Sequence, residues 1–395
     1  MLSMQLALIL AAAGAFITAN LYYAQPVVGL IGSAFSLSPA TTGLVVTLTQ
    51  LGYGLGLLAI VPLGDLFENR RLILLLTLCC VTSLFLASMS RHAGSFLAAS
   101  LCVGISSVVV QILIPYASHL APEEGRGRII GLMTSGQMLG IMLARPVAGV
   151  VAHEASWRAI FVMSGVCLSI AGAVLWSVLP RRMPDAALDY RQLLRSMARL
   201  ACTTEVLQRC AFYHAALFAS FCLFWTVVPL LLAGLRYGLS QVDIAWFSLV
   251  GAAGVAAAPV AGTVADRGWT RTATGVAMLL VAASFPMTWL AHRNTAEGVA
   301  MFAGAAVALG IGVTLHVVLG QRAIFALGVE HRSKLNGLFM AAFYLSGAAG
   351  SAIGTWAYAR GGWPLASAIG FALPMVAAMV FATEFRPGRP RPSHR

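Results

Sequence analysis

Charge is scarce in this sequence of 395 residues, since only 10% of them are Asp, Glu, Lys or Arg. Soluble globular domains carry about 25% charged residues, so a soluble protein is excluded. The hydrophobic fraction of 59% and the mean hydropathy of +0.86 place most of the chain in lipid. The formal net charge of +12 therefore has to be interpreted by how the basic residues are distributed between the two sides of the membrane. It does not require a nucleic-acid partner.

Signatures of catalytic and metal-binding proteins are also missing. The seven cysteines lie almost all within apolar runs, without the C-x-x-C or Cys/His spacing of metal sites, and we interpret them as small apolar residues. The sequence has no G-x-x-x-x-G-K motif for ATP, no H-E-x-x-H motif and no nucleophile elbow in a suitable context. We therefore expect no enzyme activity, no cofactor and no metal. The N-terminal run lacks the basic region and cleavage context of a secretory signal, and we expect it to be retained as the first helix.

Long apolar runs are what the sequence has instead. Spanning a hydrocarbon core of about 30 Å takes about 20 apolar residues, and cutting the chain at charges, Pro and Gly yields twelve such runs. Backbone groups in lipid need internal hydrogen bonds, so runs of this length predict helices rather than strands. The runs cover residues 5–31, 41–62, 71–90, 94–118, 129–151, 157–179, 211–233, 243–264, 272–291, 296–320, 335–358 and 363–383.

Basic residues indicate the orientation of these runs. With the N-terminus inside, nineteen of the 25 Lys and Arg residues fall on the inner side, five on the outer side and one, Arg145, inside a run. This asymmetry predicts that both termini are cytoplasmic. The longest polar stretch, 180–210, contains apolar and basic residues at helical spacing. We interpret it as an amphipathic helix on the inner membrane surface, with a loose linker as the alternative.

The two sides of this stretch repeat each other. Gly131 and Trp157 recur 206 positions later as Gly337 and Trp363. Two six-helix halves in parallel repeat explain the common offset. We expect a bundle over 1–179, a cytoplasmic linker over 180–210, a second bundle over 211–383 and a cytoplasmic tail over 384–395.

A charged loop follows the second run of each half. The first copy is PLGDLFENRR at 62–71, and the second is GTVADRGWTR at 262–271. The loop resembles the signature loop of the major facilitator superfamily, roughly G-x-x-x-D-R-x-G-R-R, which pins the cytoplasmic ends of neighbouring helices. The first copy departs from this pattern at Val61, Leu66 and Glu68, and a short basic cytoplasmic loop is the alternative reading. The resemblance implies a conformational latch made of Asp65, Arg70, Arg71, Asp266, Arg267 and Arg271.

The resemblance extends to two further stretches. ANLYYAQP at 19–26 and GIMLARPVAG at 140–149 look like one bacterial branch of the drug-exporter-type facilitators, often described as multidrug or sugar-efflux permeases. This branch implies an all-α membrane protein with twelve transmembrane helices in two pseudo-symmetric six-helix bundles, the major facilitator fold. In such proteins the substrate binds between the halves near the midplane.

Arg145 is the most informative single residue, because a guanidinium at membrane depth must meet a carboxylate, an anion or a wet cavity, or extend to the interface. With no acid in any run, we expect it to bond polar groups such as Asn20 or Gln111. Gating and anion recognition are its candidate roles, and snorkelling or a structural bond to a carbonyl is the alternative. Close helix packing, as in the family's antiporter motif, is indicated by the small residues around it, which are Gly136, Gly140, Ala144 and Gly149.

Aromatic and amide side chains in the runs suit an amphipathic or weakly polar solute, although packing is the alternative role for many of them. None of the 13 acids lies clearly inside a run, so Arg145 and His316 are the candidates for coupling, with packing as the alternative for the histidine. The candidate substrate-binding residues are Asn20, Tyr23, Gln25, Gln50, Gln111, Gln137, Arg145, Phe221, Trp225 and Tyr344.

These features together predict a secondary active transporter in the bacterial inner membrane. It moves a small organic solute by alternating access and exports drugs or metabolites in exchange for protons. Two alternatives stay open: uptake of a small organic anion with Arg145 as its partner, and a non-transporting receptor or scaffold with the same fold. The expected partners are the small-molecule substrate, protons and the lipid bilayer, and the chain is expected to be a monomer.

Overall fold

The computed structural model describes residues 4–120, 126–184, 189–234, 237–290, 296–328 and 332–385. Within these ranges the regular structure is entirely helical, and no strand occurs. The chain divides into two compact units, the first formed by Met1–Leu37 and Leu44–Arg195 and the second by Ser38–Gly43 and Ser196–Arg395. Each unit is described by itself.

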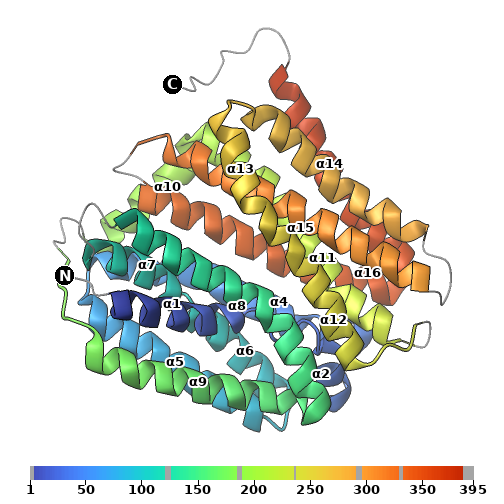
Figure 1. Cartoon of the computed structure of the whole chain (residues 1–395), viewed down its shortest axis with the longest axis horizontal. Coiled ribbons are helices and arrows are strands. Elements are labelled where there is room, and N and C mark those ends of the chain that lie inside the picture. The colour runs from blue at the N-terminus through green and yellow to red at the C-terminus, as the bar shows by residue number, and fades with distance from the viewer. Residues whose placement is uncertain are drawn as a thin grey trace. The chain divides into compact units, whose positions relative to one another are not determined.

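The first unit is built from closely packed helix pairs, with α1 against α8, α4 against α6, and α5 against α9 and α6 (Figure 1). A Cβ at Gly136 or Gly140 of α8 would collide with a carbonyl oxygen of α1, so these glycines let the two backbones touch. The bounds are α1 Met4–Ala19, α2 Val28–Ala34, α4 Leu44–Ala59, η1 Val61–Asp65, α5 Asn69–Met89, α6 Ala93–Ser107, α7 Val109–Leu120, α8 Arg126–Glu154 and α9 Trp157–Val178. The next helix, α10 Tyr190–Thr203, begins in the first unit and continues past Arg195 into the second.

The second unit is organised around α11, which packs along α16 and also contacts α15. Here too a glycine brings backbones together, since a Cβ at Gly350 would meet the carbonyl oxygen of Ala219. The bounds are α3 Pro39–Thr42, α11 Glu205–Ala233, α12 Gln241–Ala252, η3 Ala253–Ala256, α13 Ala257–Asp266, α14 Thr270–Trp289, α15 Ala296–Phe325, α16 Arg332–Ala382 and η5 Thr383–Phe385.

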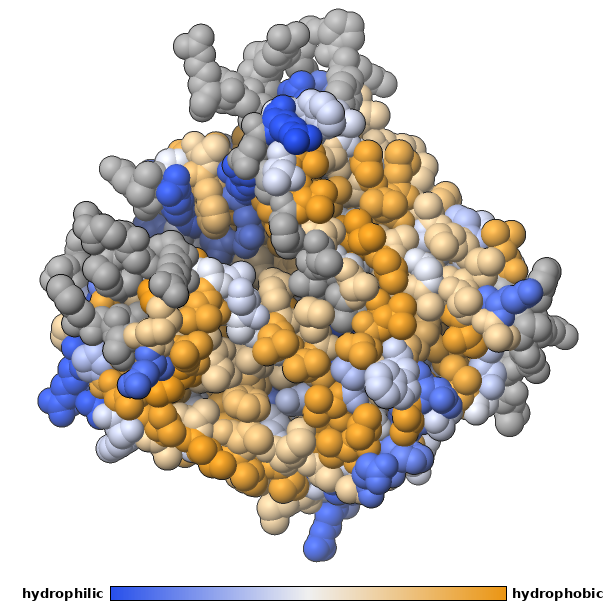
Figure 2. Space-filling view, in the orientation of Figure 1, coloured by the Kyte–Doolittle hydropathy of each residue, from blue (hydrophilic) through white to orange (hydrophobic). Residues whose placement is uncertain are grey.

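Nine helices in the described part of the chain are long and apolar enough to cross a membrane. Large apolar side chains such as Leu78, Ile170 and Trp176 are more than 60% exposed, which a lipid environment tolerates and water does not. Hydrophobic residues cover most of the face drawn in Figure 2. An all-α membrane protein is therefore confirmed.

Several of the expected runs do not form single, separate helices. The run 5–31 contains two helices, because α1 ends at Ala19 and α2 begins at Val28. The run 243–264 is divided by η3. The runs 335–358 and 363–383 lie in one element, α16, whose helical backbone is broken at Gly361 and Gly362. Gly362 has a φ of +61°, a conformation that favours glycine. Twelve separate spans therefore stay a prediction.

The polar stretch between the halves contains α10. Its residues Leu193 and Met197 are buried, whereas Arg191, Arg195 and Arg199 are exposed. The helix is therefore amphipathic, and its place on the inner membrane surface stays a prediction.

Candidate functional site

The expected run 5–31 is interrupted by irregular turns over residues 20–27. Pro26 has no N–H to donate and disfavours helical backbone at the residue before it, which favours a break here, although α8 and α11 each contain a proline. The backbone of this stretch is held by short-range bonds such as Tyr22 N–H to the Ala19 carbonyl, 3.0 Å. Tyr22, Tyr23 and Gln25 are all buried in this turn. Interrupted membrane helices expose polar groups at the depth where transporters bind solutes.

Arg145 reaches this turn from α8. It is 4% exposed, its Nε donates to Gln25 Oε1 at 2.8 Å, and its guanidinium carbon lies 5.0 Å from the centre of the Tyr22 ring. A hydrogen bond to an amide oxygen and a cation–π contact both stabilise a charge removed from water. The arginine therefore points into the unit and does not snorkel.

The partner of Arg145 differs from the two examples expected from the sequence. Asn20 accepts a hydrogen bond from Ser164 at 2.5 Å and donates to the Cys80 sulfur at 3.6 Å. Gln111 donates to the Tyr53 hydroxyl at 3.0 Å. Both amides thus tie helices of the first unit together, and Gln25, from the same run as Asn20, binds the arginine.

Three buried amide atoms of the first unit have no hydrogen-bond partner among the described residues. They are Nε2 of Gln25 and both amide atoms of Gln50, and both side chains are completely buried. Such groups cost about 1–3 kcal/mol when unsatisfied, so they are candidates for bonds to a solute. Gln137 on α8 is also buried.

The candidate residues of the second unit belong to an aromatic cluster on α11 and α16. Phe221 lies between Phe218 and Trp225, with ring centres 5.5 and 6.2 Å away. Tyr344 contacts the Phe218 ring edge-on at 6.0 Å. These rings provide flat apolar surface with few polar atoms, which suits stacking against a ring of a solute.

His316, the coupling candidate, is paired. Its Nδ1 lies 3.0 Å from Nδ1 of His214 on α11, and both rings are buried. The sequence does not predict that the two histidines touch, because 102 positions separate them.

Hydrogen bonds of Arg70, Asn69 and Arg182 hold the loop at 62–71 in place, and the sequence predicted a role there only for Arg70. Arg70 donates to the Trp176 carbonyl on α9 at 2.6 Å. The buried Asn69 donates to the Gly64 carbonyl at 2.6 Å, and its amide oxygen accepts from Arg182 at 2.7 Å. Asn69 stands where the family pattern has Arg, so this departure was its only sequence signal.

The other proposed latch residues are more exposed. Arg71 pairs with Glu68 at 3.3 Å, but its side chain is 82% exposed, and surface pairs contribute little. Asp65 and Arg267 are exposed, Arg271 is half-buried, and the side chain of Asp266 lies outside the described residues. Their role as a latch stays a prediction.

The described residues contain no group of three His, Cys, Asp or Glu side chains that could hold a metal ion. The polar atoms gathered here instead suit hydrogen bonding and charge recognition of an organic solute.

The family model described as Major Facilitator Superfamily matches residues 8–296 and 215–395. The chain is 35% identical over 384 residues to the Uncharacterized transporter YgaY of Escherichia coli O157:H7, which covers 97% of this chain and 96% of that protein. It is 24% identical over 151 residues to the Probable sugar efflux transporter of Helicobacter pylori (strain G27), covering 38% of this chain and 39% of that protein.

Solved structures share the fold at low sequence identity. A crystal structure of the nucleoside transporter NupG superposes with a TM-score of 0.74 at 12% identity, covering 97% of this chain and all of that chain. The D-xylose-proton symporter gives a TM-score of 0.70 at 14% identity, covering 95% and 96% of the two chains. With a family match over nearly its whole length and a full-length relative at 35% identity, the chain belongs to the Major Facilitator Superfamily.

Proposed function

We propose that the protein is a secondary active transporter that exports a small organic solute across the bacterial inner membrane by alternating access in exchange for protons. The observation that carries this proposal is the buried Arg145, held by Gln25 beside the Tyr22 ring at the break in the first transmembrane segment. A buried guanidinium is costly at this depth, and a polar solute is a reason to keep one there.

The chemistry of the surrounding groups defines the class of solute. Gln25 Nε2 is a buried donor with no hydrogen-bond partner among the described residues, and Gln50 offers both a donor and an acceptor. A solute with carbonyl, hydroxyl or carboxylate oxygens fits these groups of the first unit. Phe221, Trp225 and Tyr344 form a separate aromatic surface in the second unit, which suits a flat or apolar solute body.

Export is supported by a relative over part of the chain that is named a sugar efflux transporter. Exchange for protons is proposed on the buried His316, the titratable coupling candidate of the second unit. Both termini are proposed to be cytoplasmic because the basic residues collect on that side. The protein is proposed to act as a monomer.

A second candidate function is uptake of a small organic anion. The specific observation in its favour is again Arg145, whose permanent charge can bind a carboxylate in a bidentate manner. In this case the arginine recognises the solute directly, whereas for a neutral solute it mainly organises Gln25 and Tyr22.

Counterflow in proteoliposomes tests these functions. Liposomes preloaded with unlabelled sugars, aromatic amphiphiles or organic anions are diluted into the same labelled compound, and transient uptake is measured. We expect counterflow of at least one class, loss of most of it in Arg145→Ala, and partial loss in Arg145→Lys, which keeps the charge without the planar fork. The matched control is Arg360→Ala, because Arg360 is exposed on α16. Normal counterflow in Arg145→Ala would refute the proposed solute site around Arg145. Absence of counterflow in the wild type with every compound would favour a receptor or scaffold.

A further inference from the structure

Two buried histidines of the second unit face each other through the same ring atom. Nδ1 of His214 on α11 and Nδ1 of His316 on α15 are 3.0 Å apart. The rings lie within 14° of parallel, with centres 5.1 Å apart. His214 lies nine residues from the first residue of α11, which is roughly 14 Å along the helix axis. The contact is therefore inside the bundle and away from both helix ends.

The short contact restricts how many protons the pair can hold. Two neutral imidazoles form this bond with one Nδ1–H donor and one bare Nδ1 acceptor. One added proton on an Nε2 leaves that bond in place and makes it charge-assisted, which strengthens it. A second added proton would place two N–H groups against each other at 3.0 Å, so the contact would break. The geometry thus fits a site for one proton.

Aromatic rings surround the pair on its other sides. Phe343 of α16 stacks on His214 with ring centres 4.7 Å apart, and Phe339 lies at 5.2 Å. Tyr213 approaches His316 edge-on at 6.4 Å. The faces of aromatic rings attract a cation, so this cage accommodates a singly charged pair. Nε2 of His214 has no hydrogen-bond partner in the described part of the chain.

A cavity of about 80 Å³ adjoins His316 on the side toward the start of α11. A water needs about 10–15 Å³ of such space, so a few waters fit. Because Nδ1 of His316 is occupied by His214, Nε2 is the nitrogen through which this ring can exchange a proton with them. The titratable and charged groups that line the cavity are Arg209, Cys210 and Tyr213 of α11, Arg271 of α14 and Glu384 of η5.

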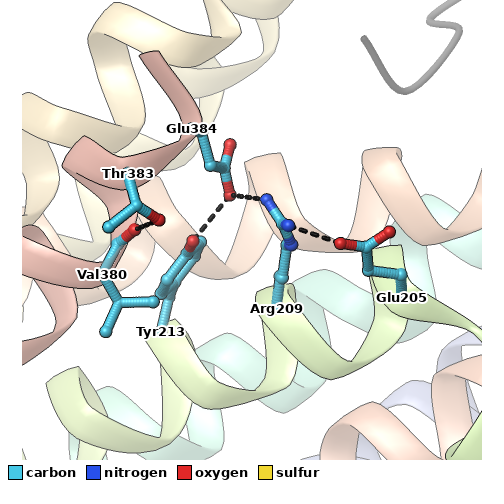
Figure 3. Close-up of polar contacts among 6 residues, drawn as sticks. All are labelled: Glu205, Arg209, Tyr213, Val380, Thr383 and Glu384. Atoms are coloured by element: carbon cyan, nitrogen blue, oxygen red, sulfur yellow. Dashed lines mark hydrogen bonds and ion pairs between the residues drawn. The ribbon is translucent and has the colours of Figure 1, made fainter. Parts of the chain in front are cut away.

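Glu384 is the one carboxylate among these described lining residues. Its Oε1 accepts a hydrogen bond from the Tyr213 hydroxyl at 2.6 Å and forms an ion pair with Arg209 at 3.2 Å. Arg209 in turn bonds Glu205 at the first turn of α11. Figure 3 shows these side chains converging between α11 and the end of the chain's last helix. Glu384 lines the cavity beside His316 and its side chain is 16% exposed, so the carboxylate can contact both solvent and the cavity.

We propose that His214 and His316 form the one-proton site that couples transport to the proton gradient, loaded through the cavity beside Glu384. This inference rests on the proposed transport function for its physiological meaning. A proton from water at Glu384 passes through the cavity waters to Nε2 of His316, and the imidazolium then keeps its Nδ1–H···N bond to His214. Release returns the proton to water and leaves the neutral pair.

Transport assays with and without a pH gradient test the coupling. In His316→Gln and His214→Gln we expect accumulation driven by the pH gradient to fall at least tenfold, while counterflow persists at a measurable rate. His92→Gln, which changes an exposed histidine, should behave as the wild type. Gradient-driven accumulation at the wild-type level in both pair variants overturns the proposal. Absence of counterflow in the wild type contradicts the proposed function instead.

A second measurement needs neither a solute nor a variant. In wild-type protein with ¹⁵N-labelled histidine, magnetic resonance should show a coupling between two Nδ1 nuclei, and titration should add a single proton to that pair. Two protons taken up by the pair, none between pH 4 and 9, or a bound zinc ion displaced on titration would each overturn the site.

Glu384→Gln tests the route, because it keeps an acceptor oxygen but cannot carry the proton. We expect the Glu384→Gln variant to show slower gradient-driven transport. An unchanged rate of gradient-driven transport would show that Glu384 is not part of the proton pathway.

Discussion

Replacing Gln25 by Glu distinguishes the two candidate solute classes. Gln25 Oε1 accepts the Arg145 Nε–H at 2.8 Å, and a glutamate of the same length keeps an oxygen at that place. The substitution therefore changes the local charge from +1 to zero while it preserves the shape of the site. It also removes the Nε2 donor of Gln25, for which the described residues provide no hydrogen-bond partner.

The expected magnitude differs greatly between the classes. A solute carboxylate about 4 Å from the guanidinium gains roughly 4 kcal/mol at an effective dielectric constant of about 20. Each 1.4 kcal/mol corresponds to about tenfold in affinity, so neutralising the site should weaken binding of an anion by roughly a thousandfold. A neutral solute loses only one hydrogen bond, about 1 kcal/mol, which is roughly a fivefold change.

The assay is the solute concentration that gives half-maximal counterflow, measured for an anionic and a neutral compound of similar size. Gln25→Met is the matched control, because it removes the hydrogen bond without adding charge. The thermal midpoint of Gln25→Glu in detergent should equal or exceed that of the wild type, since the arginine keeps an acceptor and gains a counter-charge. An anion whose half-saturation is unchanged in Gln25→Glu, although its transport requires Arg145, would refute this account of the site.

Three further outcomes are expected. Asn69→Ala should lower the thermal midpoint, because the bond to Arg182 is charge-assisted and contributes about 1.5–3 kcal/mol. Asp65→Asn should leave the thermal midpoint unchanged. As a change in the latch, it should instead alter cytoplasmic cysteine accessibility and turnover. Gly136→Val should prevent recovery of folded, monodisperse protein, because its Cβ has no room against α1, whereas Gly131→Ala has open space and should be recovered normally. Reporter fusions in α10 or after η5 should report a cytoplasmic location, and a periplasmic signal would contradict the orientation.

The sequence by itself determined the class of the protein. Hydropathy is a local property matched to the thickness of lipid, so long apolar runs identify helices without knowledge of their neighbours. The same local reasoning identified Arg145, because a charged side chain inside an apolar run is costly in lipid and is therefore a candidate functional residue. It did not predict that the run 5–31 would be interrupted, with α1 ending at Ala19 and α2 beginning at Val28.

The tertiary structure alone decided which groups meet. Arg145 and Gln25 are 120 positions apart, His214 and His316 are 102 apart, and Arg182 and Asn69 are 113 apart. Each contact depends on which helices pack together and on the rotation of each helix about its axis, and small residues such as Gly136 set that packing. Charge and hydropathy along the chain do not predict these rotations. The residue that each side chain contacts is therefore known only from the packed fold.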